Sequence, residues 1–506
     1  MSFLTAVGIF LVFGVFVLAG LYAGKKVKGV SDFMTGGGKA SGIIVSGVIM
    51  GSLVSSQTTM GSVQYAFEYG LAAWWFALGA GLGCLILALV YAKPFRDSGC
   101  DTLLQIISSE YGKSAEILSS ALSTIGIFIS ILAQILACAG LMSAVFDFLP
   151  IQVSVLISAF FMLLYVFFGG AWGAGIGGII KLILLYVISF VGMLFVLRQI
   201  DGVSGLVMDI HNFINTNGLY RINGLTDLTQ VSNQYLNIFA GGKLKNISSG
   251  IALILGVIST QTYAQAIWSA SSDKEAEKGG LISAFLIPPL GIAGVFIGAY
   301  ARSCYITEAE VSALMSAGVN CQNIPVIKST IMAFPAFLMD NFHPLFAGIA
   351  LGTLFITSIG GGGGLSLGIA TILEKDIYAR FHKDELTLSK ELFATKAILV
   401  IVLCAAGFVA STVPGSMINN LGFLSMGLRG SVVLVPMSAG LWLKDKVDKR
   451  FILLSIILSP MAVIFGKISK YKIDSLYLGI ALSIILTAAG YISKKMNRII
   501  AKITKK

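Results

Sequence analysis

Long apolar segments recur along almost the whole 506-residue chain, and they limit what it can fold into. A membrane-spanning helix needs about 20 predominantly apolar residues, and about thirteen segments reach that length. Hydrophobic residues make up 56% of the chain and charged residues only 12%, too few to cover a water-soluble protein of this size. We therefore predict an all-α integral membrane protein. The predicted spans are 3–24, 41–67, 71–93, 118–146, 151–169, 176–198, 247–268, 281–300, 343–372, 394–412, 416–443, 451–467 and 475–493.

Basic residues predict the orientation of the chain and account for its net charge of +11. Lys and Arg gather in the connections after the spans that end at 24, 93, 268 and 443, and in the tail 494–506. All lie on one side of the membrane if the N-terminus is outside and the C-terminus is cytoplasmic, as the positive-inside rule expects. We predict a multi-pass protein of the plasma membrane that binds no nucleic acid.

The sequence gives little support to other kinds of chemistry. None of the six cysteines forms a CxxC pair and the three histidines are not spaced as ligands, so no metal site is expected beyond one for a coupling ion. The motif HExxH is absent, and the one match to GxSxG, "GLSLG" (364–368), lies inside a predicted membrane span, so a membrane enzyme is not expected. Cys304 and Cys321 share one predicted external segment, 301–342, and whether they form a disulfide stays open.

Two predicted spans, 41–67 and 247–268, are unusually rich in Gly, Ser, Thr and Gln. Such residues are tolerated at bilayer depth where the backbone lines a cavity, although small residues also serve close helix packing. The two spans lie five apart, which is typical of two inverted five-helix repeats that each begin with a broken helix at the substrate site. We predict a single transporter domain. Its parts are an extra N-terminal helix (3–24), a first repeat (41–198), a second repeat (247–443), two C-terminal helices (451–493) and a basic cytoplasmic tail (494–506).

Four blocks of the sequence resemble the sodium–solute symporter family in the same order and at similar spacing. They are "SDFMTGGGKASG" (31–42), "SSQTTMGSVQYAFEYGLAAWW" (55–75), "QTYAQAIWSASSDKEAEKGGLISA" (261–284) and "EKDIYARF" (374–381). The resemblance implies a LeuT-type 5+5 inverted repeat and a symporter that moves a small-molecule substrate by alternating access. It also implies Na⁺ or H⁺ as coupling ion, no other cofactor, and a monomer. A transporter-like membrane sensor is the alternative from another functional class.

The resemblance further implies a sodium ion between the first and the eighth core helices. Its backbone ligands would be the carbonyls near Gly51 and Val54. Its two hydroxyl ligands, counted back from the aspartate of "EKDIYARF", fall on Gly360 and Gly361, the first two of five consecutive glycines. Glycine has no side-chain oxygen, so this sodium site has lost two ligands.

A small shift of register leaves a second interpretation open for the same site. Moving the count by two or three residues brings Thr357 and Ser358 to the hydroxyl positions. The chain would then be an ordinary sodium-coupled solute symporter.

Lys181 departs from the family where the fifth core helix carries an acidic residue and a glutamine beside the ion. An ionisable residue inside a span is a functional hypothesis by default. We predict that its ammonium replaces the sodium by reaching the carbonyls of Gly51 and Val54, with room left by the glycines. Transport would then be proton-coupled or sodium-independent. The alternative is that Lys181 extends to the cytoplasmic interface.

Arg429 lies in the middle of the span 416–443, where a charge costs about 2.5 to 3.5 kcal/mol without a partner. We predict that it binds an anionic or carboxylate-bearing solute. The alternative is a structural pair with Glu68 that gates the outer side. Further candidates for substrate contact supply directional hydrogen bonds beside the helix breaks: Gln57, Thr58, Gln261, Thr262 and Tyr263.

Overall fold

The computed structural model describes residues 2–25, 27–146, 148–319, 324–379, 387–412, 418–469 and 474–503. Within these residues, ten helices are long and apolar enough to cross a membrane. The count is eleven if the bent pair Lys243–Ile258 and Gln261–Ser269 is taken as one span. The chain is therefore a predominantly helical multi-pass membrane protein.

The helices follow one another in chain order with short connections. They are α1 (Phe3–Gly24), α2 (Val30–Thr35), α3 (Gly42–Leu53), α4 (Met60–Tyr69), α5 (Trp74–Ile86), α6 (Ala92–Asp97), α7 (Leu103–Tyr111), α8 (Lys113–Val145), α9 (Ile151–Gln199), α10 (Gly202–Thr216), α11 (Tyr220–Asn223), α12 (Leu228–Leu236), α13 (Lys243–Ile258), α14 (Gln261–Ser269), α15 (Asp273–Arg302), α16 (Glu308–Ser316), α17 (Ala333–Asn341), α18 (Pro344–Ile372), α20 (Leu388–Thr412), α21 (Ile418–Trp442), α22 (Lys449–Ile468) and α23 (Ser475–Ile503). The strands β1 (Ile306–Thr307) and β2 (Val326–Ile327) pair in parallel, with Ile306 opposite Val326.

The structure does not confirm the predicted count of thirteen membrane spans. The predicted span 41–67 consists of two helices, α3 and α4, and neither reaches the length of a span alone. The predicted spans 151–169 and 176–198 both lie in α9, where the backbone at Gly170 is non-helical (φ +49°, ψ −136°). Glycine permits this conformation because it has no β-carbon, so two helices meet at Gly170.

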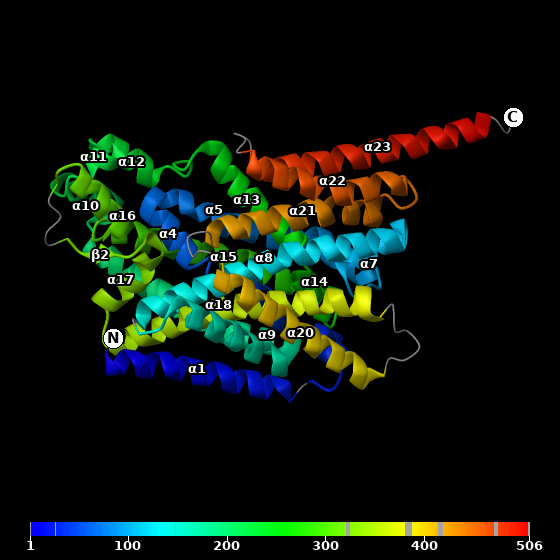
Figure 1. The fold of residues 1–506 in the computed structure, drawn as a ribbon, viewed down its shortest axis with the longest axis horizontal. Helices are drawn as coiled ribbons and strands as arrows, with labels where there is room; N and C mark the ends of the chain where they lie inside the picture. The colour runs from blue at the N-terminus through cyan, green and yellow to red at the C-terminus, as the bar shows by residue number, and fades with distance from the viewer. Residues whose placement is uncertain are drawn as a thin grey trace.

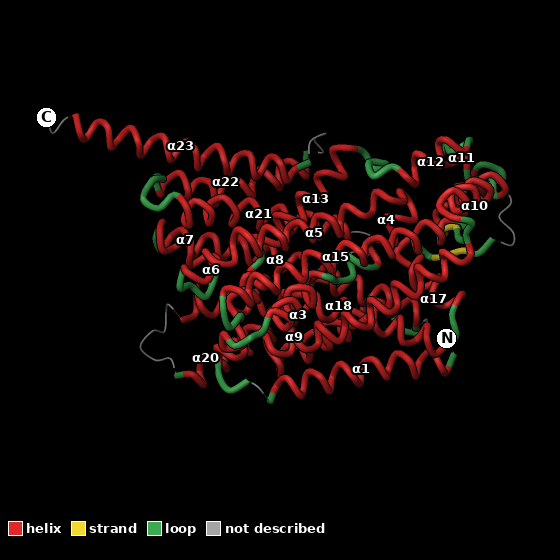
Figure 2. Tube along the Cα trace, turned by 180° about the vertical axis from the view of Figure 1, so that it is seen from behind, coloured by secondary structure: helices red, strands yellow, loops and turns green. Residues whose placement is uncertain are grey.

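The long helices run side by side along the long axis of the molecule (Figure 1). Helix α1 covers one flank and packs on α9 and α18, while α22 and α23 pack together on the opposite flank. The two termini lie at opposite ends of the bundle in both views (Figures 1 and 2). The short helices α10, α11, α12 and α16 gather at the end that holds the N-terminus.

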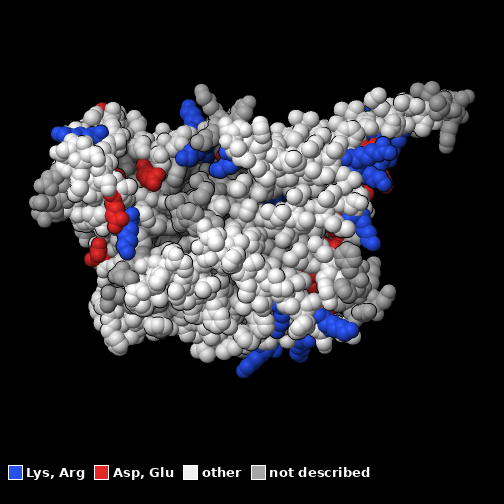
Figure 3. Space-filling view, in the orientation of Figure 1, with Lys and Arg blue, Asp and Glu red and all other residues white. Residues whose placement is uncertain are grey.

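Charged side chains concentrate toward the two ends of the molecule on the face drawn in Figure 3. The surface between these ends is almost free of Lys, Arg, Asp and Glu. Large apolar side chains are exposed on the molecular surface. Examples are Phe10, Phe285 and Phe408, with exposed fractions of 68%, 72% and 72%. An apolar belt of this kind is what a bilayer would cover.

Helix α18 carries the five consecutive glycines and stays helical through them. Each glycine meets a close neighbour that a β-carbon would crowd. A β-carbon on Gly361 would lie 2.7 Å from the Ser55 β-carbon, and one on Gly363 would lie 2.7 Å from the ring of Tyr165. The glycines lower the helix propensity of α18, but they allow α3 and α9 to pack closely against it.

Candidate functional site

The first candidate feature is the break between α3 and α4, residues 54–59. Within it the Ser55 amide donates to the Thr58 hydroxyl at 2.8 Å. Gln134 of α8 closes the other side, since it accepts from the Ser56 hydroxyl at 2.6 Å and donates to the Ser55 hydroxyl at 3.1 Å. These side chains are buried, and their hydrogen bonds hold the unwound segment in place.

The side chain of Lys181, on α9, reaches this break. Its side chain is fully buried, and its Nζ donates to the carbonyl oxygens of Gly51 at 2.5 Å and Val54 at 2.7 Å. Both carbonyls lie at the C-terminal end of α3, where the helix dipole is negative. Among the described residues, no carboxylate forms an ion pair with this ammonium. Its positive charge is therefore stabilised by peptide carbonyls, and the side chain does not extend to the membrane interface.

Gly360 borders the same ammonium on the α18 side. A β-carbon at Gly360 would lie 3.2 Å from the Gly51 carbonyl oxygen and 3.5 Å from Lys181 Nζ. The neighbouring Gly361 instead makes room for Ser55 and Gln134, not for the lysine. Gly360 therefore leaves space beside the Lys181 ammonium, as predicted for these glycines. Gly361 instead allows the unwound segment 54–59 to pack closely against α18.

The hydroxyls of Thr357 and Ser358 bond within their own helix. Thr357 donates to the Thr353 carbonyl at 2.6 Å and Ser358 to the Leu354 carbonyl at 3.3 Å. The residue of α18 that lies against the Gly51 carbonyl is Gly360, as the count without a register shift expects.

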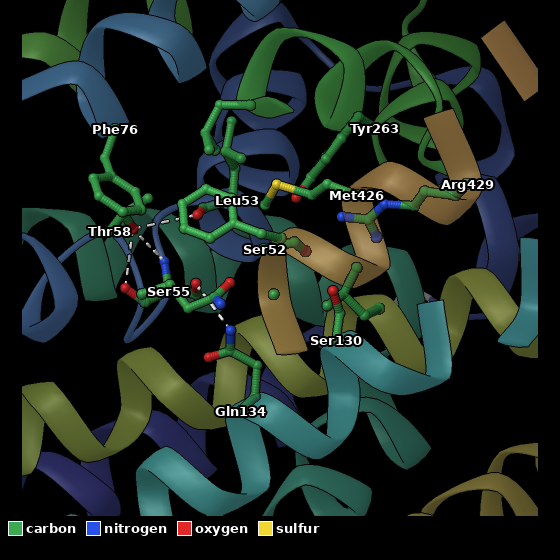
Figure 4. Close-up of a pocket in the computed structure, with 15 residues that line it drawn as sticks. Ser52, Leu53, Ser55, Thr58, Phe76, Ser130, Gln134, Tyr263, Met426 and Arg429 are labelled. Carbon is green, nitrogen blue, oxygen red and sulfur yellow. Dashed lines mark hydrogen bonds between the residues drawn. The ribbon is translucent and has the colours of Figure 1, made fainter. Parts of the chain in front are cut away.

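A pocket lies beside the first break and is drawn in Figure 4. Its water-accessible volume is about 30 Å³, enough for about two water molecules, since one needs about 10–15 Å³. The lining comes from α3 and the break, α5, α8, α13, α14, α18 and α21. The lining residues are Ser52, Leu53, Ser55, Gln57, Thr58, Phe76, Ser130, Gln134, Leu253, Tyr263, Leu365, Gly422, Phe423, Met426 and Arg429.

Arg429 supplies the one charge in this pocket. In Figure 4 its guanidinium projects from α21 toward the space beside Met426 and Ser52. The side chain is 2% exposed, and its Nε and Nη1 atoms have no hydrogen-bond partner among the described residues. The Ser52 hydroxyl in the same pocket is also buried without a partner. Unpaired buried donors are costly, and a carboxylate is the group that would satisfy this guanidinium.

The alternative pairing of Arg429 with Glu68 does not form. Glu68 lines a different cavity of about 550 Å³, together with Arg302, Glu310 and Lys328. The two residues face different spaces because Glu68 lies near the end of α4, next to α12 and α16. Any gating role of Glu68 therefore belongs to that second cavity.

The other predicted contact residues divide between the pocket and the second break, Ser259–Thr260. Gln57, Thr58 and Tyr263 line the pocket. Gln261 does not, since it accepts from the Leu103 amide at 2.9 Å and donates to the Asp101 carbonyl at 3.0 Å. Thr262 donates to the Gly364 carbonyl of α18 at 3.0 Å. Gln261 and Thr262 thus fix the short helix α14 in place.

Sequence reasoning missed three kinds of residue. Gln134 lies in an apolar span, and its polar side chain was a signal that could have found it. Phe76 and Met426 also line the pocket, but nothing in the sequence distinguishes them from apolar residues of the core. Asp376 is fully buried and accepts hydrogen bonds from Thr102, Gln105 and Ser120, so it anchors the first turn of α7. Whether Cys304 pairs with Cys321 stays open, because Cys321 lies outside the described residues.

Comparison with known proteins agrees with this architecture. A family model described as "Sodium:solute symporter family" matches residues 33–449. The chain is 24% identical over 419 residues to "Uncharacterized symporter YwcA" of Bacillus subtilis (strain 168), covering 81% of this chain and 76% of that protein.

Two solved structures share the fold. One is a substrate-bound, outward-open Na⁺-coupled sialic acid symporter, with a TM-score of 0.75 and 17% identity over 98% of both chains. The other is a nucleobase-cation-symport-1 family transporter in a closed conformation, with a TM-score of 0.55 and 10% identity over 92% of this chain and 94% of that one. The fold is therefore the predicted LeuT type. Because the family model spans most of the chain and the fold is that of transporters rather than enzymes, this chain is a solute symporter that belongs to the sodium:solute symporter family.

Proposed function

We propose that this chain transports a small carboxylate-bearing solute by alternating access, and that the Lys181 ammonium replaces a sodium ion between α3 and α18. The observation that carries the proposal is the contact of Lys181 Nζ with the carbonyls of Gly51 and Val54, at 2.5 and 2.7 Å. A bound cation at that point would use the same two carbonyls.

The ligand chemistry at this point suits an ammonium better than a free ion. A hard cation needs several oxygen ligands. Two carbonyls contact Nζ, and Gly360, the residue of α18 that borders it, has no side-chain oxygen. An ammonium needs three acceptors, and two of its N–H groups are paired here with carbonyls. Transport would then be sodium-independent, or coupled to a proton carried by the lysine amine.

The solute would bind in the pocket beside the first break. The Nε and Nη1 atoms of Arg429 have no partner there among the described residues, and a solute carboxylate would accept hydrogen bonds from this guanidinium. We propose that the transporter acts as a monomer, as its resemblance to the family implies. The N-terminus would be outside, which places the external helices α10–α12 and α16 on the outer face.

Thermal stability in sodium against choline tests the ion replacement, because an ion that binds only the folded state raises its stability by RT ln(1 + [L]/Kd). We expect no sodium-specific shift for the wild type. A saturable shift should appear in the double variant Lys181→Gln/Gly360→Ser, which removes the ammonium and adds a hydroxyl. Lys274→Gln, a substitution of an exposed lysine, is the control and should behave as the wild type.

A specific, saturable sodium shift in the wild type would contradict the replacement. Uptake into proteoliposomes then separates the remaining possibilities. Uptake that needs a sodium gradient would indicate ordinary sodium coupling, and absence of any solute movement would favour a membrane sensor.

A further inference from the structure

We infer that the C-terminal end of α23, residues 491–503, docks on a membrane surface that contains anionic phospholipids. This segment is called the C-terminal arm below. Three features of the arm carry the inference: its position in the fold, an apolar stripe along one face, and the Lys and Arg residues beside it. The docking is independent of the proposed solute and coupling ion.

The C-terminal arm projects beyond the rest of the bundle. Helix α23 runs past the other helices at the end opposite the N-terminus and slants away from them as it projects (Figures 1 and 2). A helix rises 1.5 Å per residue, so the arm is about 20 Å long. Because α23 leans outward, the outward face of the arm turns toward the membrane surface around the bundle. The proposed orientation makes this surface the cytoplasmic one.

An apolar stripe continues from the membrane span of α23 into the arm. Within the span, Ile485 lies on the exposed face of the helix, while Ser483 is buried on the other side. The next apolar residues on the exposed face are Ile492, Met496 and Ile499, at spacings of seven, four and three residues. Their exposed fractions are 57%, 55% and 48%. The stripe therefore extends the lipid-facing surface of the span beyond the bundle.

Lys and Arg residues lie on the other side of the arm and along the neighbouring connection between α21 and α22. Lys494 donates to the Val447 carbonyl at 3.4 Å, and the Arg498 guanidinium donates to the Asp445 carbonyl. These contacts hold the arm against the connection, and Lys and Arg side chains gather below the projecting helix in Figure 3. We call these residues the basic cluster: Lys444, Lys446, Lys449, Arg450, Lys494, Lys495 and Arg498.

The protein does not pair the charges of the basic cluster. Within the part of the chain that the structure describes, none of the seven side chains forms an ion pair. The segment that joins α21 to α22 holds only two acids, Asp445 and Asp448, and the Asp448 side chain accepts from the Arg450 amide at 3.0 Å as the cap of α22. The cluster therefore keeps a net positive charge.

A lipid surface with anionic headgroups fits the stripe and the basic cluster together. Clustered Lys and Arg next to a membrane span attract anionic lipids. A helix with one apolar face and one basic face is typical of segments that lie in the membrane interface. An acidic protein would match the charges, but the stripe continues a surface that lipid already covers. We therefore favour the lipid of the surrounding membrane as the partner.

Trypsin cleavage in nanodiscs that hold one copy of the protein tests the docking, since Lys494, Lys495 and Arg498 are cleavage sites. We would compare discs of phosphatidylcholine alone with discs of equal parts phosphatidylcholine and phosphatidylglycerol, and quantify the peptides by mass spectrometry. We expect cleavage in the arm to be about fivefold slower with phosphatidylglycerol, because its headgroups attract the basic cluster. Cleavage at Arg221, an exposed residue of α11 at the other end of the molecule, is the internal reference and should not change.

Variants of exposed residues separate the contribution of charge from that of the stripe. The charge variant leaves the cleavage sites of the arm intact and should lose most of the protection: Lys444→Gln/Lys446→Gln/Lys449→Gln. Its matched control removes three exposed lysines outside the cluster and should keep the protection: Lys243→Gln/Lys274→Gln/Lys278→Gln. Met496→Ser/Ile499→Ser interrupts the stripe and should also speed cleavage in the phosphatidylglycerol discs.

Equal cleavage of the wild-type arm in the two kinds of disc would overturn the docking. Equal protection in phosphatidylcholine alone would overturn the role of anionic headgroups, and protection only in discs that hold two copies would show that a second copy covers the stripe. Raising the salt from about 0.1 M to about 1 M shortens the Debye length from about 10 Å to about 3 Å and should weaken the protection. If a variant does not fold, the response of the wild type to phosphatidylglycerol and salt still decides.

Discussion

The two helix breaks occupy corresponding places in the two repeats but are held in different ways. The first, between α3 and α4, extends over residues 54–59 and receives a buried ammonium from α9. The second is only Ser259–Thr260, where α13 and α14 bend by 49°. Its hydrogen bonds are neutral: Thr260 to Gly256, Thr262 to Gly364, and Gln261 to the segment 101–103.

This difference shows that a broken membrane helix has two means of stabilisation. In the first break a covalently attached charge satisfies carbonyls that α3 leaves open at its end. In the second, the break is short and side-chain hydroxyl and amide groups suffice. We therefore expect that removing the charge destabilises the first break more than a neutral substitution destabilises the second.

The largest expected effect comes from Lys181→Met, which removes the charge and keeps most of the side-chain volume. Two buried carbonyls lose their donor, and each unsatisfied group costs about 1–3 kcal/mol. The variant no longer has to bury an ammonium, and this gain offsets part of the cost of the unpaired carbonyls. We therefore expect the free energy of unfolding to fall by about 2–3 kcal/mol. Thermal unfolding with the exposed-site variant Lys274→Met as control measures it. Wild-type stability of Lys181→Met would mean that the ammonium does not hold the break.

Adjacent glycines of α18 give the next largest effect, because Gly361→Ala and Gly360→Ala make the same chemical change at different distances from the break. At Gly361 the new carbon would lie 2.7 Å from the Ser55 β-carbon, which cannot swing away. Overpacking of this kind costs about 1–3 kcal/mol. At Gly360 the nearest atom is 3.2 Å away, and the gain in helix propensity of about 1 kcal/mol offsets the crowding.

We therefore expect Gly361→Ala to unfold at a lower temperature than the wild type and Gly360→Ala at about the same temperature. Both variants should be compared in the same detergent and without solute. Equal stability of the two would show that α18 does not need a glycine where the unwound segment packs.

Part of this site could be predicted from the sequence because its chemistry is rare in membranes. A lysine within an apolar span is a functional hypothesis by default, and the family resemblance supplied the carbonyls of Gly51 and Val54 as its predicted partners. The contact is present in the structure, while its role as an ion replacement stays a prediction. The LeuT-type fold followed from the order and spacing of several blocks, none of which sufficed alone.

The rest of the site could not be predicted because it depends on how each helix is rotated about its axis and on how deep each residue lies along its span. Gln261 and Tyr263 are two residues apart on α14, yet Tyr263 faces the pocket and Gln261 faces the segment 101–103. Sequence spacing does not give the absolute rotation of a nine-residue helix. Likewise, Glu68 was the nearest acid by position along the spans, but it lines a cavity separate from that of Arg429.

The smallest expected effect is local and concerns the second break. Gln261→Leu removes the hydrogen bonds to Leu103 and Asp101, worth about 0.5–1.5 kcal/mol each. The segment 101–103 should loosen while the fold stays intact. Cys100 adjoins this segment, is half-buried, and burial raises the pKa of its thiol. Loosening would expose the thiol and lower its pKa toward the ordinary value, so more thiolate would form and react.

We expect maleimide labelling of Cys100, followed by mass spectrometry of its peptide, to become several-fold faster in Gln261→Leu. Thr262→Val lacks only the contact with α18 and is the matched control, with little change expected at Cys100. Lys181→Met, which affects the first break, should also leave Cys100 labelling unchanged under conditions where it remains folded. If Lys181→Met accelerated the labelling as much as Gln261→Leu, the two breaks would be parts of one cooperative unit. Their separate hydrogen bonds would then not translate into separate stabilities.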